Sequence, residues 1–176
     1  MDEASGVRRQ LTLFLSGTAA PFVETLRQRV DPVQFGLIRA HVTLCREDEL
    51  ANCSASELRR RLARAACPPL TLVFGPPVRV GAHGMLLPCM AGEAAFHQLR
   101  VAALDATAIR AHAAHVTLAH PRNPRAPANL EASFASLPAR LALTFTEIAL
   151  IEQRDAQPWV VCDTIAIDGR GDPARG

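Results

Sequence analysis

One tetrapeptide, His-Val-Thr-Leu, occurs twice in this chain, at residues 41–44 and 115–118, so that the two histidines are 74 positions apart. Polar and apolar residues alternate within each copy, which is the pattern of a β-strand with one buried face. Because residues i and i+2 of a strand point the same way, the histidine of each copy shares a face with its threonine. The repeat therefore predicts two similar lobes, related by an approximate twofold, that each contribute one strand with a polar His-x-Thr face.

The segments around the two copies repeat as well. A strand-like stretch and then a helix-like stretch precede each copy, and the helix before the first copy is expected to stop at Asp31–Pro32. We expect strands at 10–16, 37–45, 70–74, 78–80, 85–90, 115–118, 141–151 and 159–167, the last two forming a terminal hairpin. We expect helices at 21–30, 54–66, 92–104 and 129–137.

Composition limits the class of protein. The 176 residues are 49% hydrophobic and 20% charged, as in an ordinary soluble domain, and a net charge of +2 is too small for binding nucleic acid through a broad basic surface. The apolar runs are too short to span a membrane, and Met1–Gln10 lacks the apolar core of a secretory signal, so we expect a cytoplasmic protein. Five cysteines without a CxxC pair indicate buried thiols rather than a disulfide framework or a zinc site.

Two His-x-Thr strands that face each other suit phosphodiester hydrolysis. A neutral histidine can remove a proton from water while a protonated one gives a proton to the departing oxygen, and an ordinary histidine pKa of about 6.5 makes both forms accessible. Threonine hydroxyls can donate hydrogen bonds to the non-bridging phosphate oxygens without a metal. A lone histidine on a strand is more often structural, but repetition of the whole unit favours the catalytic interpretation.

The two motifs, AHVTLCRE and AHVTLAHPRNP, resemble those of the two-histidine (2H) phosphoesterase superfamily, especially its bacterial 2′-5′ RNA ligase and RNA cyclic-phosphodiesterase branch. The resemblance covers about residues 11–167. It implies an α+β, bilobal fold in which two pseudo-symmetric lobes, each with an antiparallel sheet and flanking helices, enclose a central cleft. We expect a single domain over 1–168, and a disordered tail over 169–176.

The resemblance also implies the activity: hydrolysis of 2′,3′-cyclic phosphate ends of RNA or small nucleotides, with 2′-5′ RNA ligation as the reverse reaction, and no metal or other cofactor. By the same resemblance, His41 and His115 form the acid–base pair, and Thr43 and Thr117 hold the phosphate. We favour His115 as base and His41 as acid in hydrolysis, although the sequence does not fix this direction. The expected partners are RNA ends or cyclic nucleotides, not a membrane, and the expected state is a monomer.

The chain departs from the family pattern beside both motifs. Cys45-Arg46-Glu47 replaces an aromatic–glycine pattern after the first motif, and Ala114 replaces the usual proline before the second. Both changes leave the motifs intact but make the substrate less certain. A cyclic phosphate of ADP-ribose type is the alternative substrate, and a module that binds RNA or a nucleotide without turnover is the alternative function.

Three further residues are candidates for substrate binding. Arg39 lies two positions before His41 and is expected on the same strand face if the strand is regular, where it would either meet a phosphate or a base or lie beyond the cleft in solvent. Arg122 follows the second motif and would steer an anion. Trp159, the only tryptophan, would either stack on a base or belong to the core. A zinc site of His112, His115 and His120 is disfavoured, because their spacing does not suit one strand face and no carboxylate or cysteine completes the set.

Overall fold

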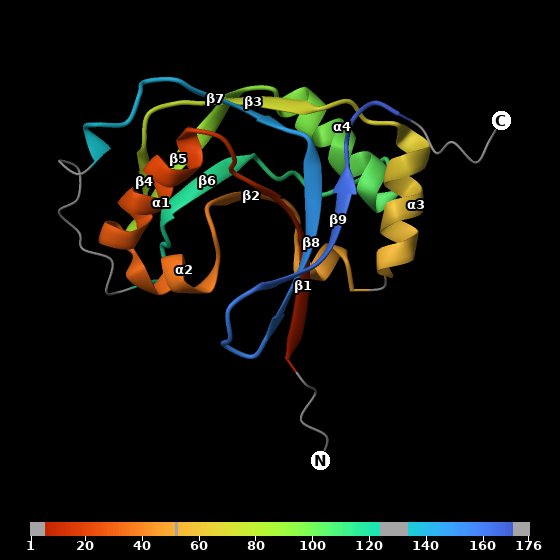
Figure 1. Ribbon diagram of the computed structural model, residues 1–176, viewed down its shortest axis with the longest axis horizontal. Coiled ribbons are helices and arrows are strands. Elements are labelled where there is room, and N and C mark those ends of the chain that lie inside the picture. The colour runs from red at the N-terminus through yellow and green to blue at the C-terminus, as the bar shows by residue number, and fades with distance from the viewer. Residues whose placement is uncertain (1–5, 52, 124–133, 171–176) are drawn as a thin grey trace, which may run out of the picture.

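The computed structural model describes residues 6–51, 53–123 and 134–170, and it contains two antiparallel sheets with helices packed around them (Figure 1). One sheet has the order β2-β1-β8-β9 and consists of β1 (Val7–Phe14), β2 (His41–Cys45), β8 (Glu147–Arg154) and β9 (Val160–Ala166). The other consists of β3 (Leu70–Phe74), β4 (Val78–Val80), β5 (Gly84–Ala91), β6 (His115–Ala119) and β7 (Leu141–Phe145). The helices are α1 (Ala19–Val30), α2 (Pro32–Leu37), α3 (Ala55–Ala65) and α4 (Glu93–Leu104), with a 3-10 turn at Glu47–Glu49. The predicted α+β class with antiparallel sheets is confirmed.

The sequence repeat becomes a structural repeat. The unit β1-α1-β2 pairs its two strands antiparallel, and β5-α4-β6 does the same in the other sheet. Within the described residues, β2 pairs only with β1, and β6 only with β5, so both histidine strands are edge strands. These two edge strands contact each other. Each helix also contacts the histidine strand of the other unit: α1 packs on β6, and α4 packs on β2. The two lobes are therefore interlocked through the histidine strands.

The first predicted helix, α1, ends at Val30, as the expected stop at Asp31–Pro32 requires, but a further helix that the sequence did not predict follows it. A second helix, α2, begins at Pro32, because the Asp31 side chain accepts a hydrogen bond from Gln34 N–H and proline suits the first helical position. The following strand consequently starts at His41 rather than at residue 37.

The predicted strand 141–151 is two strands in different sheets. β7 pairs with β3, and after Thr146 the chain enters the other sheet as β8, which lies between β1 and β9. Residues Ile148–Gln153 are buried, as a central strand covered on both faces requires. Each sheet thus takes strands from separate parts of the chain, and the expected terminal hairpin is only β8–β9.

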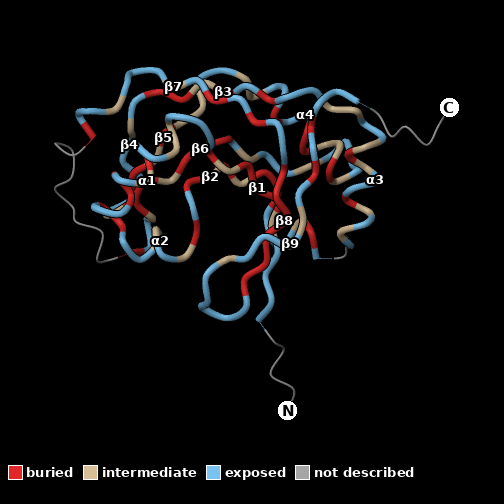
Figure 2. Tube along the Cα trace, in the orientation of Figure 1, coloured by how far each residue is buried: buried red, intermediate tan, exposed pale blue. Residues whose placement is uncertain are grey.

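Buried residues follow the strands and the inner faces of the helices (Figure 2). The valine and leucine of both motifs are 0% exposed, so the apolar face of each His-x-Thr strand is anchored in the core. No helix in the described part of the chain is long and apolar enough to cross a membrane. All five cysteines are free, but only Cys45 is buried, whereas Cys53, Cys67 and Cys89 are half-buried and Cys162 is exposed, which corrects the expectation of buried thiols.

Two expectations fall largely outside the described residues. The helix expected at 129–137 lies mostly within 124–133, and most of the tail expected to be disordered lies within 171–176. At the start of that tail, Gly169 N–H donates a hydrogen bond to Cys67 O at 3.0 Å.

Candidate active site

The two motifs have the same burial pattern in the structure. In both β2 and β6 the histidine and threonine are half-buried, whereas the valine and leucine are fully buried. His41 and Thr43 therefore share one face, as His115 and Thr117 do, which is the arrangement that the alternating sequence predicts.

Each catalytic candidate is held in the same tautomer. His41 Nδ1 lies 2.7 Å from Arg39 O, and His115 Nδ1 lies 2.9 Å from Ala113 O. Because a carbonyl oxygen only accepts, Nδ1 of both rings must carry the proton. Nε2 of each neutral ring is then left with its lone pair, ready to take a proton.

His112 connects the two strands. Its Nε2–H donates to Thr43 O at 3.0 Å, and its ring centroid lies 5.8 Å from that of His115. His41 and His115 are also close enough for the charge of His115 to contribute to lowering the pKa of His41. The structure thus brings together the two histidines that the repeat predicted, on neighbouring strand edges.

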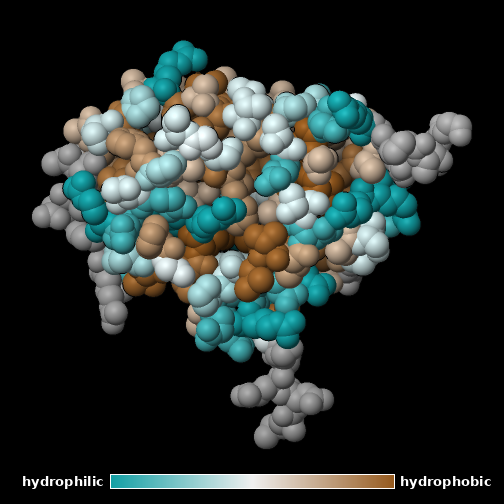
Figure 3. All heavy atoms as spheres, in the orientation of Figure 1, coloured by the Kyte–Doolittle hydropathy of each residue, from teal (hydrophilic) through white to brown (hydrophobic). Residues whose placement is uncertain are grey.

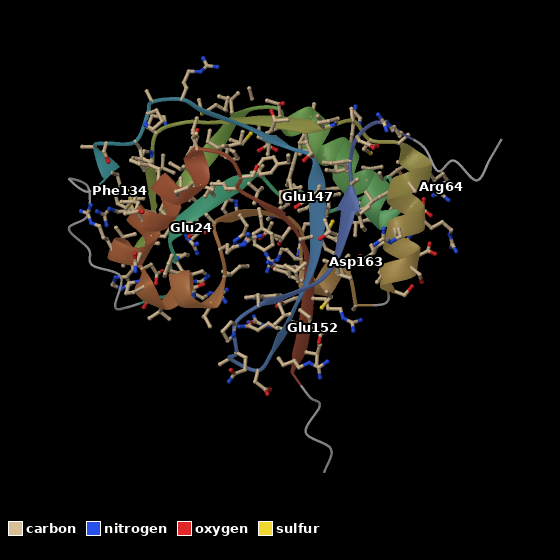
Figure 4. All side chains as sticks on the ribbon, in the orientation of Figure 1. Glu24, Arg64, Phe134, Glu147, Glu152 and Asp163 are labelled. Carbon is tan, nitrogen blue, oxygen red and sulfur yellow. The ribbon has the colours of Figure 1, made fainter. Side chains whose placement is uncertain are left out.

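A glutamate fixes the start of each histidine strand. Glu24 of α1 accepts a hydrogen bond from Ala40 N–H, and Glu93 of α4 accepts one from Ala114 N–H at 2.9 Å. Glu24 is labelled beside α1 in Figure 4, near β2 and β6. Each glutamate belongs to the helix of the same β-α-β unit as the strand that it fixes.

A buried charged residue of the opposite unit fixes the other end of each strand. Arg100 of α4, which is 0% exposed, donates through Nε to Leu44 O at 2.8 Å, and its Nη2 contacts the Glu49 carboxylate. Asp31, between α1 and α2, is likewise 0% exposed and accepts from His120 N–H at 2.8 Å, just beyond β6. Each histidine strand is therefore attached to both units.

Burial dominates the electrostatics of His41. Loss of hydration lowers its pKa to about 4, while the hydrogen bond to Arg39 O opposes this change and the charges of Arg27 and His115 add to it. His41 is consequently neutral at pH 7 in the ligand-free protein.

An aromatic ring and a guanidinium flank His41. The Phe14 ring lies edge-on to the imidazole, 6.3 Å between centroids, and Arg39 places its guanidinium 4.1 Å from the Phe14 centroid. Arg39 precedes β2 and is exposed, which corrects its expected place on the strand face of His41, and it reaches the surroundings of that histidine through Phe14. In the second unit Pro88 pairs with His115 and Ala113 takes the place of Arg39, so the surroundings of the two histidines differ.

The other two candidates lie at different distances from the motifs. Trp159 is half-buried and, like Phe14, packs against a small buried cluster that includes Ile38 and Ile151, so it has a packing role near the site. Arg122 is exposed beyond the C-terminal end of β6, whereas His115 is the first residue of that strand. The structure therefore does not place Arg122 beside the histidines. The space-filling view shows apolar side chains around a shadowed hollow near the centre of the face it displays (Figure 3).

Metal ligands do not gather in the described part of the chain. No group of three or more His, Cys, Asp or Glu residues there is placed to hold a metal ion. His120, the third member of the zinc hypothesis, instead accepts a hydrogen bond from Arg122 N–H through Nδ1, at 3.1 Å.

Sequence reasoning missed Phe14, Glu24, Glu93, Asp31, Arg100 and His112 as residues that build the site. None of them repeats at a fixed distance from the two histidines. A covered glutamate or arginine is expected to have a partner, but Glu24, Glu93 and Arg100 each bind a backbone group at least 16 residues away, which the sequence does not reveal.

Comparison with known proteins agrees with this architecture. The profile of the 2′-5′ RNA ligase superfamily matches residues 15–157. No curated protein matches at a significant level. Among solved structures, E. coli LigT complexed with 3′-AMP is similar with a TM-score of 0.62 and 17% identity, covering 92% of this chain and 98% of that one. The protein TT0787 of Thermus thermophilus is similar with a TM-score of 0.57 and 18% identity, covering 94% and 99%.

At these identities the solved structures show a shared fold, whereas the profile covers most of the chain and includes both His-x-Thr strands. The chain belongs to the 2′-5′ RNA ligase superfamily, and so to the 2H phosphoesterases.

Proposed function

We propose that this protein is a metal-independent cyclic phosphodiesterase that opens 2′,3′-cyclic phosphate ends of RNA or small nucleotides, using His41 and His115. The observation that carries the proposal is the matched pair of imidazoles on adjacent strand edges, each with Nδ1 bound to a carbonyl. This arrangement leaves two Nε2 atoms for proton transfer at one phosphate. Because one chain supplies both histidines, a monomer is sufficient.

In the proposed reaction a water oxygen attacks phosphorus and its proton passes to Nε2 of the neutral histidine. The bond from phosphorus to one ribose oxygen breaks, and the protonated histidine gives its Nε2 proton to that oxygen. The product is a phosphate monoester beside a free ribose hydroxyl, and proton exchange with solvent restores the starting states. Thr43 and Thr117 hydroxyls donate to the non-bridging oxygens, whose negative charge grows in the transition state. The reverse sequence would join 2′-5′ ends.

The unequal surroundings of the two histidines support one direction of binding. Phe14 and Arg39 offer an aromatic ring and a planar cation on the His41 side, and both groups stack on nucleobases. A nucleoside held there would place the departing ribose oxygen next to His41. His41 is then the acid and His115 the base.

The acid role of His41 depends on the substrate. Burial lowers the pKa of His41 to about 4 in the ligand-free protein, so the ring is neutral at pH 7. A bound phosphate anion acts in the opposite sense, because a nearby negative charge stabilises the imidazolium. The proposal therefore requires that substrate binding raises the pKa of His41. The structure of LigT with 3′-AMP is in keeping with a site for nucleotide monophosphates in this fold.

The test is incubation of the protein with 2′,3′-cyclic AMP, and with an oligoribonucleotide that ends in a cyclic phosphate, in excess EDTA. Chromatography identifies whether a 2′- or a 3′-phosphate is formed. We expect turnover in EDTA, and a loss of roughly 10²- to 10⁴-fold in both His41→Ala and His115→Ala. His97→Ala, an exposed histidine on α4, is the matched control and should keep full activity. Retained activity in both catalytic variants would rule out the mechanism.

The same assay separates the alternatives. A panel that includes ADP-ribose cyclic phosphate identifies a different substrate of the same chemistry. If no cyclic phosphate is consumed and the two histidine variants bind nucleotide as tightly as the unchanged protein, the chain is a binding module.

A further inference from the structure

Each catalytic histidine shares a peptide group with one of the two strand-fixing glutamates. The carbonyl of Arg39 and the N–H of Ala40 belong to the same peptide unit; the carbonyl accepts from His41 Nδ1–H and the N–H donates to Glu24. The peptide unit between Ala113 and Ala114 does the same, with His115 Nδ1 at 2.9 Å on its carbonyl and Glu93 Oε1 at 2.9 Å from its N–H. Both β-α-β units therefore contain the same hydrogen-bonded series of three groups: a carboxylate, a peptide and an imidazole.

A peptide group transmits the effect of one hydrogen bond to the other. A carboxylate that binds the N–H draws electron density toward the carbonyl oxygen, since nitrogen and carbonyl are conjugated. The oxygen becomes a better acceptor for Nδ1–H, which holds the imidazole in the Nδ1–H tautomer and stabilises the imidazolium. A carboxylate in direct contact with a histidine has the same two effects.

We propose that Glu24 and Glu93 are positioning residues, each acting on its histidine through the intervening peptide. The two contacts arise from different helices, and each glutamate lies at a different distance along the chain from its histidine. A chance packing contact would not be expected to reproduce the same peptide, the same atoms and the same order of groups twice. The consequence for turnover rests on the proposed function, but the effect on the tautomer does not.

The charged groups around the two carboxylate–peptide–imidazole series are unequal. Glu24 is paired with the buried Arg27 at 2.9 Å, and His41 also faces His115 and lies near Arg39. Because Arg27 offsets part of the Glu24 charge, the effect on His41 should be the smaller one.

On the other side, His115 faces His112 and His41, and Glu93 lies beside Cys89. The ion pairs among the described residues include none for Glu93. Its full charge therefore bears on the peptide that holds His115, and Glu93 is the stronger test of the proposal.

The experiment compares Glu93→Gln and Glu93→Ala with Glu24→Gln and Glu24→Ala. Glutamine keeps an oxygen acceptor for the peptide N–H but removes the charge, whereas alanine removes both. Glu147→Gln, an exposed glutamate at the start of β8, is the matched control for the loss of one negative charge. Nitrogen-15 NMR of the imidazoles, without any ligand, reports the tautomer of His41 and His115.

We expect the alanine variants to lose the Nδ1–H tautomer preference of the affected histidine. The glutamine variants should keep this tautomer, but the backbone amide proton of Ala40 or Ala114 should shift less far downfield, because a neutral oxygen is a weaker acceptor than a carboxylate. In activity assays, Glu93→Ala should lose roughly 10- to 100-fold in kcat, with partial rescue by Glu93→Gln. Loss of the charge should also move the acid limb of the pH–rate profile to lower pH in Glu93→Gln.

The two proposals can fail separately. If the ligand-free imidazole and amide spectra of both glutamine variants match those of Glu147→Gln, the carboxylates do not act through the peptide, whatever the activity. If the spectra change as expected but no cyclic phosphate is consumed, the positioning role stands and the proposed reaction is wrong. The glutamine variants retain the hydrogen bond, so the test does not depend on folding of the alanine variants.

Discussion

Replacement of Arg100 by methionine tests whether one buried guanidinium fixes the first histidine strand. Arg100 is 0% exposed and donates to Leu44 O at 2.8 Å, to Arg110 O at 2.7 Å and to the Glu49 carboxylate. Methionine fills much of the same volume but donates no hydrogen bond. Breaking a buried ion pair by removing one partner costs about 3–5 kcal/mol, chiefly because the remaining charge is left unpaired. We expect the free energy of unfolding to fall by about that amount.

Urea denaturation followed by circular dichroism measures the change. Arg64→Met is the matched control, because the Arg64–Asp105 pair is exposed, at 58% and 49%, and such pairs contribute less than about 1 kcal/mol. Adding Glu49→Gln to Arg100→Met should recover part of the loss, since it removes the unpaired carboxylate. A loss below about 1 kcal/mol in Arg100→Met would refute the reasoning, since the strand would then be fixed by other contacts.

Three further predictions concern the site itself. Thr43→Val and Thr117→Val should each lower kcat/KM by roughly 10²- to 10³-fold, with little change in the free energy of unfolding measured in urea. Unchanged kinetics would show that the hydroxyls do not bind the phosphate. Because the pKa of His41 is lowered from 6.5 to about 4, the unfolded chain binds more protons between these pH values, so stability should fall as the pH drops from 6.5 to 4. This pH-dependent loss of unfolding free energy is on the order of 3 kcal/mol and should vanish in His41→Gln. Urea titrations at several pH values measure it, and equal pH dependence in the two proteins would contradict the prediction. Phe14→Leu should raise KM for nucleotide substrates by roughly 10-fold through lost stacking, whereas an unchanged KM would place the base elsewhere.

The paired site residues follow from the sequence because their signal is local. Alternation within each His-Val-Thr-Leu copy fixes which side chains share a face, and the apolar face determines which side enters the core. The structure bears out this arrangement residue by residue in β2 and β6.

The errors arise where the same residues permit two structures. Asp31–Pro32 both ends α1 and begins α2, since aspartate caps a helix and proline suits its first turn. The run 141–151 is apolar enough for one strand, but its division at Thr146 depends on pairing with β3 on one side and β1 on the other. Pairing between distant strands leaves no periodic pattern in the sequence.

The residues that align the two histidines were missed for a related reason. An edge strand leaves one row of backbone groups without a sheet neighbour, and these groups need other partners when they are covered. In β2 two such carbonyls, of Thr43 and Leu44, accept from His112 and Arg100, which both belong to the opposite unit. The unpaired edge of one sheet therefore becomes the means by which the other unit is attached to it. Two His-x-Thr strands alone determine which groups face outward, whereas the attachment of β2 to the opposite unit depends on side chains that bind its free edge.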